Sequence, residues 1–279
     1  MDIHELQLPE NHRETASRFV AACQADDRIV AAFLGGSYAS EDADKFSDLD
    51  LYFVTTDESY EGFLLEKERF VHQLGESLFL EDFGVPHGYC FMLSNTTEGE
   101  FWFGSESHFK NIYSGPYKVL LDKKNILVED AFPAPIADQN KQLEVLQRQI
   151  DWFWHELSHF IKAMGRNQLW FAYGQIETMR RMCTRLARLK HNFSDAYLEE
   201  DEPYFKIEQA LPIEDLYPLQ TTFCSMEYDA MLEAAFVLCR FYQDTAPELA
   251  KAHHLSYETD LERTWISQLK ELSQASSKL

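Results

Sequence analysis

Two acidic residues separated by one leucine, Asp48 and Asp50, are the first residues whose types and spacing could do chemistry. They begin an apolar run that is typical of a strand, in which residues two apart direct their side chains to the same face. Neighbouring carboxylates repel each other, and both stay ionised only when a cation neutralises them. Mg²⁺ prefers such hard oxygen ligands and usually takes one or two carboxylates together with substrate phosphates. The pair therefore predicts a magnesium site.

A small turn upstream offers a matching phosphate site. The apolar run Ile29–Leu34 ends at Gly35-Gly36-Ser37, and ten residues separate Ser37 from Asp48. Glycines at a strand end let backbone N–H groups face an anion, and Ser37 adds a hydroxyl donor. A helix expected from Tyr38 would direct its positive end to the same point. Gly-Gly-Ser alone is typical of a loop turn and Asp-x-Asp of a solvated edge, but together, between two apolar strands, they favour nucleotide chemistry.

The elements that must position these residues alternate over the first 135 residues. Helical spacing is seen at residues 12–26 and 60–74. Short apolar runs rich in β-branched and aromatic residues predict strands. These predicted strands are Ile29–Leu34, Leu49–Val54, Leu78–Leu80, Tyr89–Leu93, Gly99–Phe103 and Lys118–Leu121.

The pattern changes at Phe132-Pro133-Ala134-Pro135, because two prolines in three residues cannot continue a helix or a central strand. Helical spacing follows at residues 141–164, 168–190, 218–242 and 257–272, with Trp152, Trp154, Trp170 and Trp265 among them. We therefore expect an α+β protein with a mixed sheet in residues 1–135 and a helical bundle in residues 136–279.

The order Gly36-Ser37 followed by Asp48-Leu49-Asp50 resembles the signature of the DNA polymerase beta-like nucleotidyltransferase superfamily. Within it, the chain is most similar to small-molecule antibiotic nucleotidyltransferases, which modify lincosamides and aminoglycosides. The resemblance implies that Gly36 and Ser37 bind the phosphates of a nucleoside triphosphate, most simply ATP. It also implies that Asp48 and Asp50 hold Mg²⁺.

The family implies a third acidic residue on a nearby strand, for which Glu98, Glu100 and Glu106 are candidates. Glu100 is favoured because flanking aromatic residues should partly desolvate its carboxyl, raise its pKa and suit it to act as a general base. The stretch from Gly99 to Glu106 also resembles the corresponding strand of lincosamide nucleotidyltransferases. Whether Glu100 acts as the base or as a third metal ligand stays open. A third possibility is that Glu100 lies on an edge strand and simply faces water.

The helical half offers further candidates. Residues 153–172 resemble the helix pair that follows the catalytic domain in streptomycin and lincosamide nucleotidyltransferases and helps to cover the substrate cleft. Lys162 and Arg166, four apart, could hold the triphosphate, or they could form a solvated basic stripe. His155 and His159 lack the HExxH pattern of a zinc site. The acidic run at residues 199–202 is either a solvated loop or an attractor of cationic substrates.

Composition restricts the partners. The chain of 279 residues carries 25 basic and 47 acidic side chains, a formal charge of -22, which disfavours nucleic acids and anionic membranes and favours a cationic acceptor. No apolar run has the roughly eighteen residues of a spanning helix, and the polar N-terminus does not resemble a signal peptide. Five dispersed cysteines indicate a reduced, cytoplasmic protein. The sequence does not decide whether the chain forms a homodimer.

The predicted activity is Mg²⁺-dependent transfer of AMP from ATP to a hydroxyl of a small cationic molecule, such as a lincosamide or an aminoglycoside, with release of pyrophosphate. Two alternatives are nucleotide transfer onto a protein hydroxyl, as in toxin–antitoxin systems, and a non-catalytic nucleotide-binding regulator. The large helical half argues against the first alternative. The presence of Asp48, Asp50 and Glu100 argues against the second.

Overall fold

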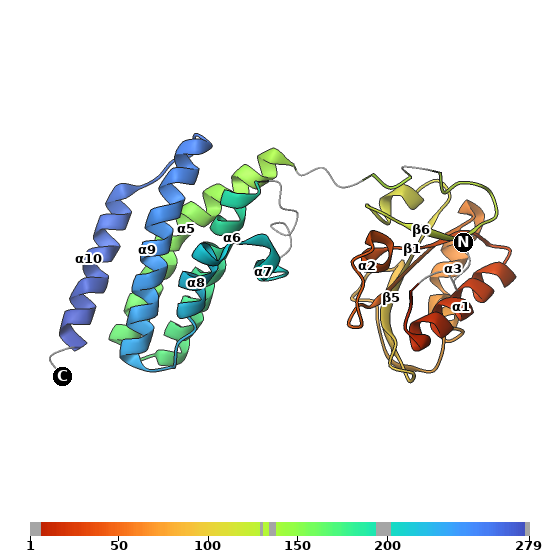
Figure 1. Ribbon diagram of the computed structural model, residues 1–279, viewed down its shortest axis with the longest axis horizontal. Helices are drawn as coiled ribbons and strands as arrows, with labels where there is room; N and C mark the ends of the chain where they lie inside the picture. Colours follow the sequence, from red (N-terminus) through yellow and green to blue (C-terminus); the bar gives the residue numbers. More distant parts are fainter. Residues whose placement is uncertain (1–6, 129–130, 134–137, 194–201, 277–279) are drawn as a thin grey trace. The chain divides into compact units, whose positions relative to one another are not determined.

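The computed structural model describes residues 7–128, 131–133, 138–193 and 202–276 (Figure 1). The chain divides into two compact units, Met1–Pro135 and Ile136–Leu279. Each unit has its own apolar core. None of the described helices combines the length and the apolar composition that a membrane span requires.

The first unit is built on a six-stranded mixed sheet with the order β3-β4-β5-β2-β1-β6. Its strands β2 and β5 pair in parallel, and the other neighbours pair antiparallel. This confirms the predicted fold class, and each predicted strand lies within an observed one. The bounds are β1 Ile29–Leu34, β2 Leu49–Thr55, β3 Ser77–Glu81, β4 Gly88–Leu93, β5 Glu98–Ser105 and β6 Lys118–Asp122.

One face of the sheet is covered by helices. Phe19 of α1 (Glu10–Ala25), Phe63 of α3 (Tyr60–Leu64) and Phe70 of α4 (Lys67–Val71) pack on Phe53 of β2. The prediction of one helix over residues 60–74 was wrong. Helix α3 ends because the N–H groups of Leu65 and Glu66 return to the carbonyls three residues back.

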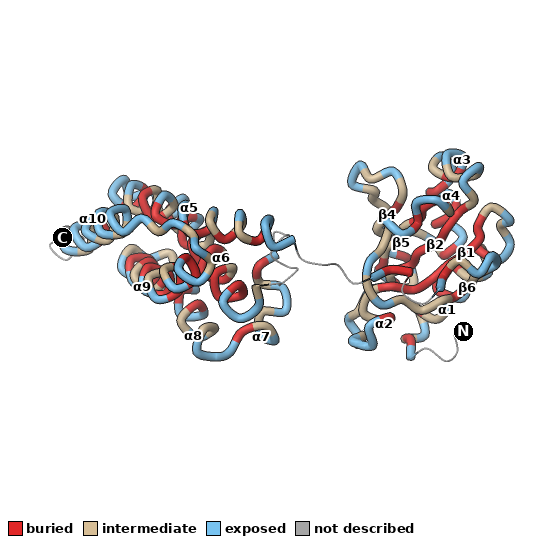
Figure 2. Tube along the Cα trace, turned by 90° about the horizontal axis from the view of Figure 1, so that it is seen from above, coloured by how far each residue is buried: buried red, intermediate tan, exposed pale blue. Residues whose placement is uncertain are grey.

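The opposite face is covered mainly by the irregular chain around β6. It holds a second core that includes Phe33 of β1, Tyr52 of β2 and Phe132. The buried strands run through the middle of this unit in Figure 2. Because side chains alternate along a strand, Leu49, Leu51 and Phe53 face the helices. Asp50 and Tyr52 therefore belong to the other face, which is free of helices α1, α3 and α4.

The second unit is helical, as predicted. Its helices are α5 (Gln139–Gly165), α6 (Leu169–His191), α7 (Ile207–Ala210), α8 (Ile213–Thr221), α9 (Tyr228–Ala252) and α10 (Thr259–Ser276). The predicted helix over residues 218–242 is in fact the end of α8 and most of α9. Thr222 ends α8 because its N–H and its hydroxyl both bond to the Leu219 carbonyl, while its own hydroxyl oxygen accepts from the buried Arg180 at 2.7 Å.

Candidate active site

The Asp50 carboxylate packs directly against the Gly35-Gly36 turn. Helix α2 (Gly36–Ser40) begins at Gly36, two residues before the predicted start, and Gly36 has a φ of +56°. A Cβ atom on Gly36 would lie 1.7 Å from Oδ2 of Asp50. The Gly35 N–H donates to the Asp50 carbonyl at 3.0 Å. Only glycine fits both the positive φ and the close approach of this side chain.

Gly36 and Ser37 present different groups to a ligand. The Gly36 N–H already donates to Oη of Tyr113 at 3.2 Å. The Ser37 hydroxyl is buried and has no hydrogen-bond partner within the described residues. Buried hydroxyls normally have a hydrogen-bond partner. A buried hydroxyl without one, at this position, is what we expect of a group that binds a ligand. In this geometry Ser37, more than Gly36, offers a free donor to a phosphate.

Asp48 and Asp50 differ in their surroundings. Asp50 is the second residue of β2 and is partly buried. Asp48 is exposed and lies one residue before the strand, so the expectation of two acids within the strand was wrong for Asp48. The reason is a turn in which the Ser47 N–H bonds to the Asp44 carbonyl, after which β2 pairing begins at Leu49.

Glu100 lies beside Asp50 through strand register. In the parallel pair of β2 and β5, Glu100 is opposite Asp50, and in the antiparallel pair of β4 and β5 it is opposite Cys90. Side chains directly opposite each other share one face of the sheet. The thiol of Cys90 donates to Oε2 of Glu100 over 3.9 Å. Asp50 and Glu100 therefore share one face of the sheet beside the Gly36 turn, and Asp48 lies near enough for its charge to act on both.

The other two acidic candidates lie elsewhere. Glu98 is exposed at the start of β5. Glu106 follows the far end of β5 and forms an ion pair of 2.7 Å with Lys124. Neither residue has the register position of Glu100.

The pKa values of Asp50 and Glu100 are both raised, chiefly by burial. Burial, followed by the charges of Asp48 and Glu100, raises the pKa of Asp50 to about 7. Burial also raises the pKa of Glu100, an effect that hydrogen bonding from Trp102, Tyr52 and Cys90 opposes. The direction at Glu100 is the one expected from its aromatic neighbours. The shift at Asp50 comes first from its burial in the fold, then from the repulsion by Asp48 that the sequence predicts, and last from Glu100, which only the strand register brings close.

These residues fit a hard divalent cation bound together with substrate. Carboxylate oxygens are the donors that Mg²⁺ prefers. Burial is the main cause of the raised pKa of Asp50, and the repulsion from Asp48 and Glu100 adds a part that a bound cation would relieve. Among the described residues, no three His, Cys, Asp or Glu side chains converge closely enough to hold a metal ion by themselves. Mg²⁺ usually completes its coordination with water and substrate phosphates, so one or two carboxylates suffice here.

The candidates of the helical half belong to the second unit. Lys162 is exposed near the end of α5, and its Nζ lies 5.7 Å from the centroid of the Trp265 ring. Arg166 is the residue that ends α5, not part of its face, because the left-handed Asn167 follows. The rings of His155 and His159 lie 4.4 Å apart. Residues 199–201 of the predicted acidic run lie outside the described residues.

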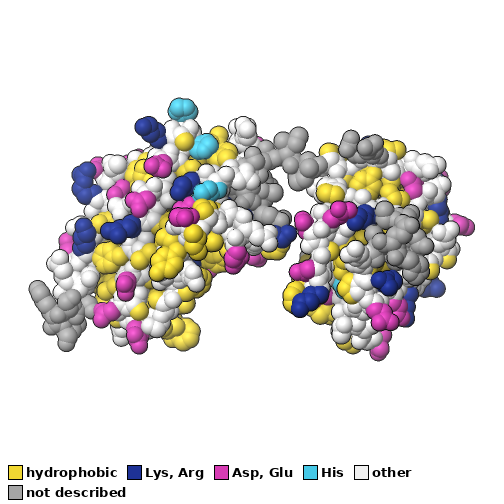
Figure 3. All heavy atoms as spheres, in the orientation of Figure 1, with side chains coloured by type: hydrophobic (Ala, Val, Ile, Leu, Met, Phe, Trp, Pro, Cys, Tyr) yellow, Lys and Arg dark blue, Asp and Glu magenta, His cyan; other side chains and the backbone are white. Residues whose placement is uncertain are grey.

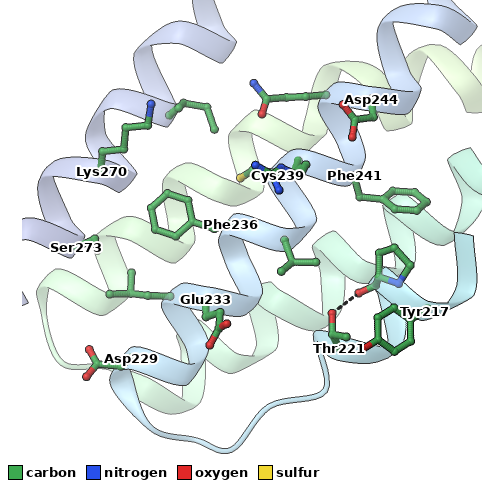
Figure 4. A pocket seen from close by; sticks show the side chains of 16 residues that line it. Tyr217, Thr221, Asp229, Glu233, Phe236, Cys239, Phe241, Asp244, Lys270 and Ser273 are labelled. Atoms are coloured by element: carbon green, nitrogen blue, oxygen red, sulfur yellow. Dashed lines mark hydrogen bonds between the residues drawn. The ribbon is translucent and has the colours of Figure 1, made fainter. Parts of the chain in front are cut away.

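A cavity of about 990 Å³ lies on the helical unit among α8, α9 and α10 (Figure 4). Acidic Glu233 and Asp244 line it together with basic Arg240 and Lys270. Such mixed charge does not select a phosphate or a metal, so we place the chemistry at the three acids of the first unit. On the face of the molecule shown in Figure 3, acidic side chains are scattered over both units and do not gather into one patch.

Comparison with known proteins gives the family of the chain. A model of the streptomycin adenylyltransferase family matches residues 10–272, which is nearly the whole chain. The chain belongs to this family. This adenylyltransferase also aligns with the crystal structure of an aminoglycoside 6-adenyltransferase from Bacillus subtilis, at 15% identity and a TM-score of 0.43, over 95% of this chain and 99% of that one. No curated protein sequence matches it significantly.

Groups that contact this site were missed by sequence reasoning, among them Tyr113 and Cys90. Tyr113 bonds to the Gly36 turn, and Cys90 bonds to Glu100. Neither residue stands next to a recognisable motif, and no spacing in the chain relates them to residues 36–50. Only the sheet register and the path of the loop before β6 bring them to the site.

Proposed function

We propose that this adenylyltransferase transfers AMP from ATP to a hydroxyl of a small cationic antibiotic, an aminoglycoside or a lincosamide, and releases pyrophosphate. The observation that carries the proposal is the register of Asp50 with Glu100 beside the unpaired Ser37 hydroxyl. This arrangement supports the proposal because it brings together a hydroxyl that can donate a hydrogen bond to a phosphate, carboxylates suited to a metal ion and a candidate base. The family match supports adenylyl transfer as the reaction.

Each residue has a role that follows from its surroundings. The Ser37 hydroxyl donates to a phosphate oxygen of ATP and helps to fix the triphosphate. Asp48 and Asp50 would hold Mg²⁺, which when bound neutralises the phosphates and stabilises the charge on the leaving pyrophosphate. Because the Asp50 carboxylate packs against Gly36, it would hold the metal ion next to the Ser37 turn.

Glu100 is proposed as the general base. Its raised pKa makes it a better proton acceptor than an ordinary glutamate, and its strand position fixes it next to Asp50. It takes the proton from the acceptor hydroxyl, whose oxygen then attacks the α-phosphorus opposite the pyrophosphate leaving group. Holding the hydroxyl and the phosphorus in line supplies much of the rate enhancement in such reactions.

We propose that residues 1–135 carry out catalysis and that the helical unit, residues 136–279, contributes to recognition of the acceptor. The formal charge of -22 supports a cationic acceptor. Lys162 and Arg166 remain proposed triphosphate contacts, on the basis of their charge alone.

The test is a transfer assay with purified protein, Mg²⁺ and ATP labelled at the α-phosphate, against a panel of aminoglycosides and lincosamides. We expect labelled antibiotic and pyrophosphate in equal amounts from the wild type, and none from Asp48→Asn. Parallel reactions with GTP, CTP and UTP test the choice of ATP. Label transferred to protein in a cell extract, with none on any antibiotic, would overturn the proposal.

A further inference from the structure

A tyrosine far along the chain holds the backbone of the Gly35-Gly36 turn. The hydroxyl of Tyr113 accepts the Gly36 N–H at 3.2 Å and donates to the Pro116 carbonyl at 2.6 Å. Both hydrogen-bonding functions of the hydroxyl are therefore used on backbone groups, one in the turn and one in the loop before β6. The hydroxyl links two segments that are 77 residues apart.

The ring of Tyr113 supports the turn from the same side. A Cβ atom on Gly35 would lie 2.8 Å from the Tyr113 ring and 2.7 Å from the Tyr52 ring. The two tyrosine rings pack on each other with centroids 4.7 Å apart. The turn thus lies between a tyrosine pair that contacts Gly35 and the Asp50 carboxylate that contacts Gly36.

We propose that Tyr113 is a positioning residue for nucleotide binding, which acts by fixing Gly36 so that the Ser37 hydroxyl and the Asp50 carboxylate face the same substrate. Tyr113 need not touch the nucleotide. The inference rests on the proposed function only for the identity of the ligand. The physical link itself, from Tyr113 to the turn, stands on the two hydrogen bonds and the ring contacts.

Tyr117 provides a matched control. It belongs to the same aromatic cluster, where it packs on Phe33 and Phe132, and its hydroxyl also donates to a backbone carbonyl, that of Val128. The bond from Tyr117 to Val128 does not involve the turn. Tyr113→Phe and Tyr117→Phe therefore each remove one hydroxyl from the same cluster, but only Tyr113→Phe leaves the Gly36 N–H without its acceptor.

The experiment measures the affinity of the full-length wild type and both variants for a nonhydrolysable ATP analogue with Mg²⁺ by calorimetry. It also measures hydrogen exchange of the backbone amides in residues 35–40. For Tyr113→Phe we expect about tenfold weaker binding, the equivalent of one net hydrogen bond, and faster exchange at the Gly36 amide. Tyr117→Phe should leave both quantities unchanged, and the KM for the acceptor should stay the same in both variants.

Two results would overturn the inference. Unchanged or tighter nucleotide binding by Tyr113→Phe would mean that its hydroxyl does not help, or that it occupies the place of a phosphate oxygen. Equal losses in the two variants would indicate general packing of the aromatic cluster. If the wild type binds no nucleotide, the proposed function fails, while the exchange rate at Gly36 still decides whether Tyr113 fixes the turn.

Discussion

Replacing Gly36 with alanine should displace the Asp50 carboxylate from its position against the turn. The added Cβ would lie 1.7 Å from Oδ2 and 2.6 Å from Cγ of Asp50, far inside van der Waals contact. The alanine would also have to adopt the left-handed φ of +56°. Because the site is a packed turn on a central strand, the carboxylate has to leave its position or the turn has to shift.

The cost of Gly36→Ala has two parts. A left-handed conformation costs a non-glycine residue about 1–2 kcal/mol, and forcing an extra carbon into a packed site costs about 1–3 kcal/mol. We therefore expect the free energy of unfolding to fall by roughly 2–5 kcal/mol. Nucleotide transfer should fall by about 100-fold or more, since a displacement of about 1 Å in an active site has that effect.

Gly84→Ala separates these two parts. Gly84 has a φ of +75°, but a Cβ atom there would meet nothing within 4 Å. This variant should therefore lose only the backbone part, about 1–2 kcal/mol, and keep its activity. The assays are urea unfolding followed by circular dichroism and steady-state transfer of labelled AMP.

A double-mutant cycle with Asp50→Ala tests the contact itself. Truncation removes Cγ and Oδ2 and leaves Cβ of Asp50 at 3.3 Å from the new methyl, a distance that small shifts can relieve. Gly36→Ala should therefore cost about 1–3 kcal/mol less in the Asp50→Ala background than in the wild type. The reasoning is refuted if Gly36→Ala costs no more than Gly84→Ala, or if the two changes simply add.

Four further predictions concern the acids and Ser37. Asp48→Asn should abolish transfer without loss of fold, because an amide binds Mg²⁺ weakly and the change relieves repulsion with Asp50; activity and thermal unfolding measured on one preparation check this. Ser37→Ala should weaken ATP-analogue binding by about 1.5–3 kcal/mol and leave acceptor binding unchanged, as measured by calorimetric titration; equal nucleotide affinity would return the turn to a structural role. Glu100→Gln should retain Mg²⁺–nucleotide binding but slow the chemical step about 10²–10⁴-fold, and the acid limb of the rate against pH should disappear; a collapse of Mg²⁺–nucleotide affinity would instead make Glu100 a metal ligand. Asp50→Asn should flatten the pH dependence of stability in the metal-free protein: the pKa of Asp50 rises from 3.8 to about 7 on folding, so the folded chain holds a proton that the unfolded chain has released, and wild-type stability should fall as the pH rises through this window. Thermal unfolding of both proteins between pH 4 and pH 8 tests the sign. The comparison with Asp50→Asn is needed because Asp26, Asp57 and Asp82, whose pKa values are lowered, act in the opposite direction; a wild-type stability that rises with pH relative to Asp50→Asn contradicts the assignment.

Much of the fold could be predicted because its signals are local. Each strand carries a short apolar or aromatic run, and all six residues of β1 are apolar and buried. The helices that were predicted too long, over residues 60–74 and 218–242, failed for a different reason. Apolar spacing continues through both stretches, and only the hydrogen bonds at Leu65 and Thr222 show where each helix ends.

The candidate site was predictable where its residues are close in sequence. Ser37, Asp48 and Asp50 stand within one turn-and-strand segment, so their types and spacing indicate the chemistry. The tie from Gly36 to Tyr113, the thiol beside Glu100 and the high pKa of Asp50 all depend on contacts between distant segments. No pattern of residue types marks such contacts in a single sequence.

The parallel pairing of β2 with β5 has a consequence for how this protein can change. Between the two strands the chain makes α3, α4 and the β3–β4 hairpin, which lie outside the pairing of Asp50 with Glu100. An insertion or deletion in the connections of this excursion leaves the two acids opposite each other, whereas a slip of one residue within β5 would turn Glu100 to the helix-covered face. The separation of the two acids along the chain can therefore change widely while they stay opposite each other in the sheet. A search for the equivalent residue should follow the strand that pairs with β2, not a fixed number of residues.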